Sequence, residues 1–260
     1  MSEFIRVTRP STACAVVTID RPEKRNALNE AAWGALAEAF ETLSSDRAVR
    51  AIVLTGVPGA FCAGDDILAF SALRDDPQGR QRYWDTIMRA YRAVSGAAMP
   101  VISAIDGPCI GGGCTLALRT DFRIAGAGAI FAVPPARLGL VYPAESCALL
   151  ADAVGTTMAK YMLYSGQKIP SARAVAAGLA WAATGGDALA TALALAEEMA
   201  LSAPLSVRAS KLTCDARALG RLDEVMPQIE RLSEQADQSA DYREGAAAFA
   251  QKRKPRFTGA

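Results

Sequence analysis

The chain has 260 residues, a formal net charge of +1 and 51% hydrophobic residues. This composition is typical of a globular protein and excludes a disordered or fibrous one. Because the net charge is close to zero, no overall field attracts nucleic acid or a membrane surface, and we expect neither as a partner.

The N-terminal quarter begins with a pattern typical of a hairpin. Residues 4–9 and 13–19 are rich in β-branched side chains and flank a turn at Pro10. A helix should follow, with Asn29 as its N-cap. Its apolar residues recur at three- and four-residue spacing, at Trp33, Leu36, Phe40 and Leu43. The short apolar run 51–55 predicts the next strand.

Strand and helix patterns then alternate. We expect a helix over about 77–95, a strand at 101–105, a helix from about 112, and strands near 121–125 and 129–132. This alternation is typical of α/β layering.

The last quarter of the chain is predicted to be helical. The apolar spacing from residue 187 onward favours helices to the end of the chain, interrupted at Pro204 and Pro227.

Two glycine-rich turns are the most informative segments. Ala60–Ile67 and Ile105–Leu118 each read as a strand, a glycine turn and the start of a helix. One interpretation is that both segments are simply tight strand-to-helix connections. Two helix N-termini that converge would instead bind an anion or an oxyanion through their unpaired N–H groups. Neither segment has the G-x-G-x-x-G spacing of a dinucleotide site.

Several kinds of chemistry are excluded or disfavoured by composition. The chain has no histidine, which excludes Ser-His-Asp and Cys-His catalysis and removes the commonest zinc ligand. The six cysteines are scattered and form no C-x-x-C pair, so we expect reduced, buried thiols and no metal site. The first residues lack a signal-peptide pattern, and we expect a cytoplasmic protein.

Four blocks, in this order, resemble the signature blocks of the enoyl-CoA hydratase/isomerase (crotonase) superfamily. They are Arg21–Leu28, Phe61–Ile67, Pro100–Gly113 and Arg243–Lys254. The resemblance implies an α/β fold, a crotonase-like spiral of ββα repeats with a helical C-terminal region. It divides the chain into a spiral core over 1–198 that carries an acyl-CoA site and an oligomerisation region over 199–260. It also implies a homotrimer or a hexamer.

The resemblance further implies site residues. The backbone N–H groups of Asp65 and Gly112 would hold the oxygen of an acyl-CoA thioester. Coenzyme A would be part of the substrate, with no separate cofactor. The substrate-binding positions that correspond to the family's are Lys24, Arg25, Ala27, Ala63, Asp66, Ile67, Phe249 and Lys252. Phe249 and Lys252 would reach the CoA of a neighbouring subunit, although the basic cluster 252–256 is also consistent with a solvated tail.

This sequence departs from the family at both glutamates that hydratases use. The first position is Thr115 and the second is Pro135. Neither side chain can activate water as a carboxylate does. We therefore expect isomerisation, decarboxylation or other enolate chemistry in place of plain hydration.

Three other side chains are candidates for compensating groups. The Asp65 carboxylate would be adverse beside an oxyanion unless it turns away or stays protonated, and we expect it to cap the following helix. Glu145 lies at a predicted helix start, where an acid is favoured by the helix dipole without any catalytic role. Tyr142 could hydrogen-bond a substrate group or close a pocket. Glu145 and Tyr142 are tentative catalytic residues.

Two further hypotheses remain open at this stage. One is an acyl-CoA-binding protein that keeps the fold without catalysis. The other is a nucleotide-binding α/β protein unrelated to CoA, which the glycine spacing disfavours.

Overall fold

A computed structural model describes residues 3–260. The strands are β1 (Ile5–Thr8), β2 (Cys14–Ile19), β3 (Ala51–Gly56), β4 (Val101–Ile105), β5 (Pro108–Ile110), β6 (Phe122–Ala125), β7 (Ile130–Ala132), β8 (Ile169–Pro170) and β9 (Ala182–Ala183). The α-helices are α1 (Glu30–Ser45), α2 (Ile67–Ser71), α3 (Pro77–Ser95), α4 (Gly112–Leu118), α5 (Ala144–Ser165), α6 (Ser171–Ala176), α7 (Ala188–Ala200), α8 (Pro204–Ala218), α9 (Leu222–Gln238) and α10 (Ala240–Ala250). Two short 3-10 helices are η1 (Pro22–Lys24) and η2 (Pro135–Leu138).

The strands form two sheets. The larger sheet has the order β1-β2-β3-β4-β6-β9, and the smaller has the order β5-β7-β8. In the larger sheet β1 and β2 pair antiparallel, as the predicted hairpin requires, and the other pairs are parallel. The two sheets alternate along the chain, since β4 continues almost directly into β5 and β6 precedes β7. This alternation is the predicted spiral of strands and helices.

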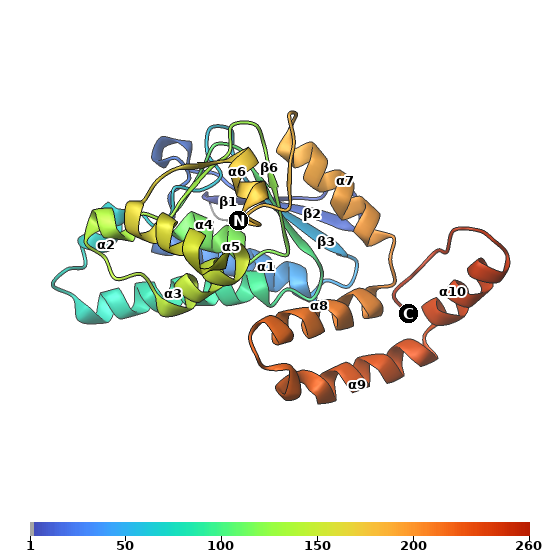
Figure 1. Cartoon of the computed structure of the whole chain (residues 1–260). Coiled ribbons are helices and arrows are strands. Elements are labelled where there is room, and N and C mark those ends of the chain that lie inside the picture. Colours follow the sequence, from blue (N-terminus) through green and yellow to red (C-terminus); the bar gives the residue numbers. More distant parts are fainter. Residues whose placement is uncertain (1–2) are drawn as a thin grey trace.

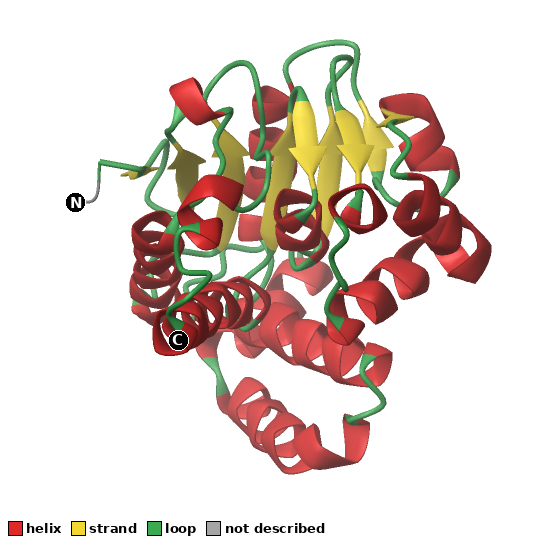
Figure 2. Ribbon diagram, turned by 90° about the vertical axis from the view of Figure 1, so that its left-hand side faces the viewer, coloured by secondary structure: helices red, strands yellow, loops and turns green. Residues whose placement is uncertain are grey.

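The larger sheet is covered on both faces, which explains why its central strands are apolar throughout. On one face α1 packs through the predicted stripe of Trp33, Leu36 and Phe40, and α3 packs beside α1. On the other face α7 contributes a row of alanines at four-residue spacing, which lets the helix approach the strands closely. Figures 1 and 2 show the strands between these helices.

The predicted C-terminal region is helical, but two details differ. Residue 198, the expected end of the core, falls inside α7, which packs on the sheet, so the helices that leave the sheet begin at Pro204. The prediction that Pro227 interrupts the helices is wrong. It lies inside α9, which continues around it on an exposed face. A single missing N–H costs one intrahelical hydrogen bond, and the rest of the helix persists.

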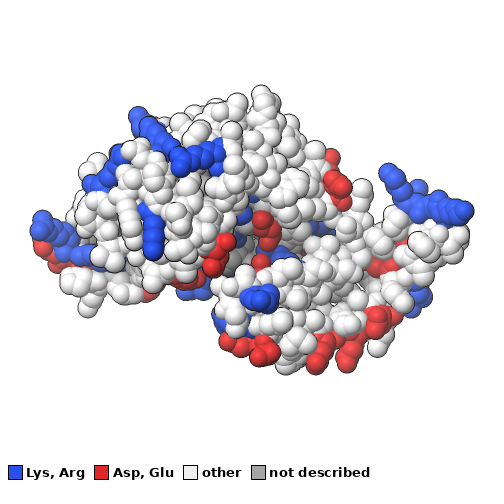
Figure 3. All heavy atoms as spheres, in the orientation of Figure 1, with Lys and Arg blue, Asp and Glu red and all other residues white. Residues whose placement is uncertain are grey.

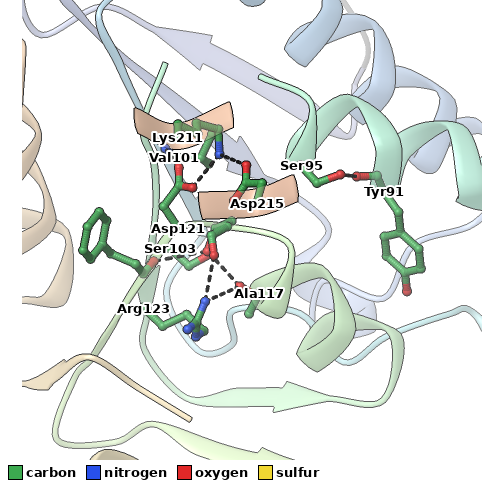
Figure 4. A network of polar contacts seen from close by, with 11 residues as sticks. Tyr91, Ser95, Val101, Ser103, Ala117, Asp121, Arg123, Lys211 and Asp215 are labelled. Atoms are coloured by element: carbon green, nitrogen blue, oxygen red, sulfur yellow. Dashed lines mark hydrogen bonds and ion pairs between the residues drawn. The ribbon is translucent and has the colours of Figure 1, made fainter. Parts of the chain in front are cut away.

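The last three helices bury few side chains and lie away from the sheet, α9 and α10 farthest (Figure 1). A buried ion pair ties α8 to the core. Lys211 Nζ lies 2.5 Å from Asp121 Oδ1 and 3.3 Å from Asp215 Oδ2, while Asp121 Oδ2 accepts a hydrogen bond from the Val101 amide (Figure 4). A cavity of about 980 Å³ lies between the core and α8 beside this pair.

Two remaining expectations concern cysteines and membranes. The six cysteines are free, but only four are buried, because Cys147 is half-buried and Cys214 is exposed on α8. Within residues 3–260, no single helix is long and apolar enough to span a membrane, and α7 and α8 pass only as a pair bent by 113°.

Candidate active site

Three segments that are far apart in the sequence meet at the two glycine turns. The Cys62 amide donates to Pro108 O at 3.1 Å, and the Ile110 amide donates to Cys62 O at 2.9 Å, so the two turns run side by side. The Leu28 amide donates to Gly64 O at 2.8 Å, which adds the loop that precedes α1. The two glycine turns therefore lie side by side, together with the loop before α1.

Glycine is required at Gly64 by close approach. Its φ of +94° lies in the region that L side chains rarely adopt, and a Cβ placed there would lie 3.0 Å from the Gly112 nitrogen and 2.8 Å from Ile110 O. The amide of Gly112 is the first in α4 and has no acceptor within the helix. Among residues 3–260, neither the Asp65 nor the Gly112 amide donates to another residue. The Gly112 N–H group therefore has no acceptor among the described residues, and the Asp65 N–H group contacts only the carboxyl of its own side chain.

The Asp65 side chain does not cap a helix, so that prediction is wrong. The helix α2 begins at Ile67, one residue later than the cap would require, and Asp66 is its N-cap through the Ala69 amide. The Asp65 carboxyl instead points inward, where its Oδ1 accepts a hydrogen bond from Trp33 Nε1 at 3.0 Å. Burial raises the pKa of this carboxyl to about 6, and the hydrogen bond from Trp33 opposes part of that shift.

Sequence reasoning missed two residues around this carboxyl. Trp33 was predicted only as part of an apolar stripe, and Tyr91, which donates to Gly112 O at 3.1 Å, was given no role. Their rings meet edge to face, with centroids 5.3 Å apart. A buried indole N–H needs an acceptor, which was the available signal for Trp33. The acceptor itself, Asp65, could not be identified from local spacing.

The two positions at which the resemblance implies glutamates, Thr115 and Pro135, lie in different surroundings. Thr115 is buried in α4, and its Oγ1 lies 2.6 Å from the hydroxyl of Tyr142. Pro135 is buried at the start of η2 and offers no polar side-chain atom. Burial raises the pKa of the Tyr142 phenol well above its usual range, so the phenol stays protonated. The hydroxyl of Tyr142, a predicted catalytic residue, is therefore hydrogen-bonded to the hydroxyl of Thr115.

Glu145 is placed at the predicted helix start, in the first turn of α5, but it faces outward. Its side chain is 62% exposed and pairs with Arg119 at 2.8 Å. Arg119 also lies over the ring of Tyr91, 5.3 Å from the ring centroid. Glu145 is thus linked to the site through Arg119.

The predicted CoA-binding positions fall into two groups. Lys24, Arg25, Ala27, Ala63, Asp66 and Ile67 lie on the loops around the two turns, where the Ala63 amide donates to Arg25 O at 3.1 Å. The Asp66 carboxylate is occupied by the α2 cap and by Arg21, at 3.4 Å. Phe249, 87% exposed, and Lys252 lie on and just after α10. In Figure 3 basic side chains gather where the C-terminal tail follows α10.

Comparison with known proteins shows the family of this chain. The family model for enoyl-CoA hydratase/isomerase matches residues 9–260. The chain belongs to this family, the crotonase superfamily, and is an enzyme by that membership.

Relatives of known name cover nearly the whole chain. It is 30% identical to the 1,2-epoxyphenylacetyl-CoA isomerase of Escherichia coli, over 100% of both chains. It is 32% identical to an enoyl-CoA hydratase of Mycobacterium tuberculosis, over 93% of this chain and 92% of the relative.

Solved structures agree in fold. An enoyl-CoA hydratase/carnithine racemase from Magnetospirillum magneticum superposes with a TM-score of 0.90 at 34% identity, covering 100% of this chain and 97% of the other. An enoyl-CoA hydratase from Bacillus anthracis has a TM-score of 0.91 at 26% identity, covering 99% and 100%.

Proposed function

We propose that this crotonase-family enzyme binds an acyl-CoA thioester and stabilises its enolate with the backbone N–H groups of Asp65 and Gly112. The observation that carries the proposal is the pair of neighbouring amides that donate to no other described residue, the Asp65 amide contacting only the carboxyl of its own side chain. Fixed N–H donors strengthen as negative charge develops on the thioester oxygen. Loss of one such donor typically lowers the rate by about 10²–10³-fold.

The reaction is isomerisation, decarboxylation or other enolate chemistry in place of plain hydration. The support is the replacement of both hydratase glutamates, because Thr115 and Pro135 cannot deprotonate water at neutral pH. The Thr115 hydroxyl is also engaged with Tyr142 at 2.6 Å. Tyr142, which is hydrogen-bonded to Thr115, and Glu145, which reaches the site only through Arg119, are the side chains that this proposal keeps as catalytic candidates.

The CoA part of the substrate binds along the loops that surround the two turns. Lys24 and Arg25 are exposed beside Ala63 and can reach phosphates. Phe249 and Lys252 extend to the CoA of a neighbouring subunit in a homotrimer or a hexamer, which accounts for an exposed phenylalanine. The reaction needs no separate cofactor, and the enzyme acts in the cytoplasm without a nucleic-acid or membrane partner.

Mass spectrometry of acyl- and enoyl-CoA esters incubated with the protein in deuterated water tests the proposal. Deuterium at the α carbon, or loss of carbon dioxide from a malonyl-type ester, is expected and would identify the reaction type. Addition of water to an enoyl ester would contradict the exclusion of hydration.

A further inference from the structure

The proposed chemistry requires a group that moves a proton to or from the substrate carbon, and one carboxyl lies beside the proposed donors. Asp65 Oδ1 accepts the hydrogen bond from Trp33 Nε1 at 3.0 Å. The other oxygen, Oδ2, accepts no hydrogen bond from another residue in the described part of the chain. It lies so close to Gly112 that a Cβ on that glycine would be 2.7 Å away. Oδ2 therefore lies against a proposed oxyanion donor.

Together with burial, the negative charge of the Asp65 carboxyl raises the pKa of four nearby groups. In the described chain, these groups are Cys62, Tyr83, Tyr91 and Tyr142. Burial raises the pKa of each of them, so none is ionised at neutral pH.

The two cations that lie close to these groups have other partners. Arg119 stacks on the Tyr91 ring and pairs with Glu145 at 2.8 Å. Arg21 pairs with Asp66 at 3.4 Å. Asp65 is thus a partly buried carboxyl without an ion-pair partner within residues 3–260. Its hydrogen bonds come from Trp33 Nε1 and from its own backbone amide, and a buried charge with a purely structural role would call for an ion-pair partner as well.

A fixed negative charge at this position would oppose the proposed reaction, because like charges close together are unfavourable. A carboxylate that accepts the substrate proton removes this conflict. As the proton reaches the carboxylate, its charge disappears, and the same charge appears on the thioester oxygen. The net charge of the pocket is then constant through the step.

We infer that the side chain of Asp65 is the catalytic acid/base of the site, and this inference rests on the proposed enolate chemistry. The Asp65 carboxylate accepts the proton of the substrate α carbon through Oδ2. The C–H electron pair becomes the C=C bond of the enolate, and the carbonyl π electrons move to the oxygen held by Gly112. The neutral carboxyl then returns its proton to the α carbon of the enolate. In an isomerisation it returns the proton to another carbon that carries part of the enolate's negative charge.

The role of Trp33 follows from the same geometry. Its N–H stabilises the charged form of Asp65 and keeps Oδ1 occupied, which leaves Oδ2 as the oxygen that exchanges the proton. Trp33 is therefore a positioning residue. Removing its N–H should make the carboxyl harder to ionise.

The test measures exchange of the α proton for deuterium in an acyl-CoA ester that the wild-type enzyme exchanges, together with the Kd of that ester. Asp65→Asn keeps both backbone donors and can still accept from Trp33. We expect its exchange rate to fall by at least about 100-fold with Kd changed less than about twofold, as for loss of an acid/base group. Asp75→Asn, on an exposed turn, is the matched control and should exchange like the wild type.

A second measurement uses Trp33→Phe and the pH dependence of exchange. The wild-type rate should rise with pH to a plateau, with a midpoint near the Asp65 pKa of about 6. The midpoint should shift to higher pH in Trp33→Phe, which an altered packing role alone would not cause. If Asp65→Asn binds the ester poorly, the pH dependence of exchange in the wild type and in Trp33→Phe still tests the role of Asp65.

The outcomes are distinguishable. Exchange by Asp65→Asn at the wild-type rate, or an unshifted midpoint in Trp33→Phe, overturns the role of Asp65 and leaves the enolate proposal standing. A wild-type enzyme that exchanges no ester in the panel overturns both.

Discussion

The two halves of the site differ in what they are made of. The half that would hold the thioester oxygen consists of backbone N–H groups at Asp65 and Gly112, on turns where a side chain at Gly64 would collide with the facing strand. The half that would carry the acid/base groups consists of side chains, and the family resemblance aligns Thr115 and Pro135 with its two glutamate positions.

This difference shows which part of such a site can change without loss of the fold. The amides are positioned by the sheets and by α4, so any sequence that keeps the glycines keeps the donors. A side chain can be exchanged while the backbone stays, and the chemistry then depends on the nearby groups. The predictions below test each half, beginning with the largest effect.

Gly112→Pro should cause the largest loss, because it removes one donor. Proline is tolerated at the first position of a helix, so α4 should still form. Gly112→Ala is the matched control, since it brings the same Cβ toward Asp65 and keeps the N–H. We expect kcat/KM about 10²–10³-fold lower in the proline variant than in the alanine variant. Equal kcat/KM values would remove Gly112 from the oxyanion site.

Asp65→Asn should change stability in a pH-dependent way. Burial raises the pKa of this carboxyl in the folded protein from 3.8 to about 6, so the folded state binds its proton more tightly than the unfolded state. The stabilisation is fully present below the unfolded pKa and is lost as pH rises through about 6. The asparagine variant does not incur this loss and should be more stable than the wild type at about pH 8, by up to about 3 kcal/mol.

Urea unfolding at about pH 4 and about pH 8 measures this effect, and the difference between the two proteins should be larger at the higher pH. A difference that does not depend on pH would show that Asp65 is ionised in the folded protein as readily as in the unfolded chain.

The hydrogen bond between the Thr115 and Tyr142 hydroxyls should contribute a coupling energy of about 1 kcal/mol to the free energy of unfolding. Thr115→Val and Tyr142→Phe each leave one hydroxyl without its 2.6 Å partner, and the double variant removes both. A double-mutant cycle on the free energy of unfolding gives the coupling, and a value near zero would mean that the pair does not form in solution. If only Tyr142→Phe lowers kcat, Tyr142 contacts the substrate directly.

Lys252→Gln should have the smallest effect, because an exposed ion pair contributes at most about 1 kcal/mol. We expect KM for the acyl-CoA ester to rise by up to about fivefold, with kcat unchanged and with a weaker salt dependence. Lys160→Gln, on the exposed side of α5, is the control. Identical KM values for the two variants at low ionic strength would show that the basic cluster is a solvated tail.

Much of the core could be predicted from local patterns. The strand at 101–105 and the helix over 77–95 coincide with β4 and α3, and Asn29 caps α1 as predicted. These elements have strong periodicity and clear caps, so neighbouring residues are sufficient to define them. The predicted interruption at Pro227 was wrong because a proline inside a helix has only an average energetic cost, and α9 continues in spite of it.

The site was only partly predictable, for a physical reason. The four signature blocks, which include both glycine turns, are properties of residue identity, and their resemblance predicted the family that the family model confirms. The donor half of the site stays a prediction from that resemblance. The direction of the Asp65 side chain depends on Trp33, which lies 32 residues away in the sequence.

Other decisive contacts join still more distant residues. Tyr142 is 27 residues from Thr115, and Lys211 is 90 residues from Asp121. Local patterns report backbone conformation and burial, whereas each of these contacts depends on which elements the fold brings together. The sequence alone determined the family, the two turns and the missing glutamates. Only the tertiary structure decided that a carboxyl with a raised pKa lies beside the proposed oxyanion donors.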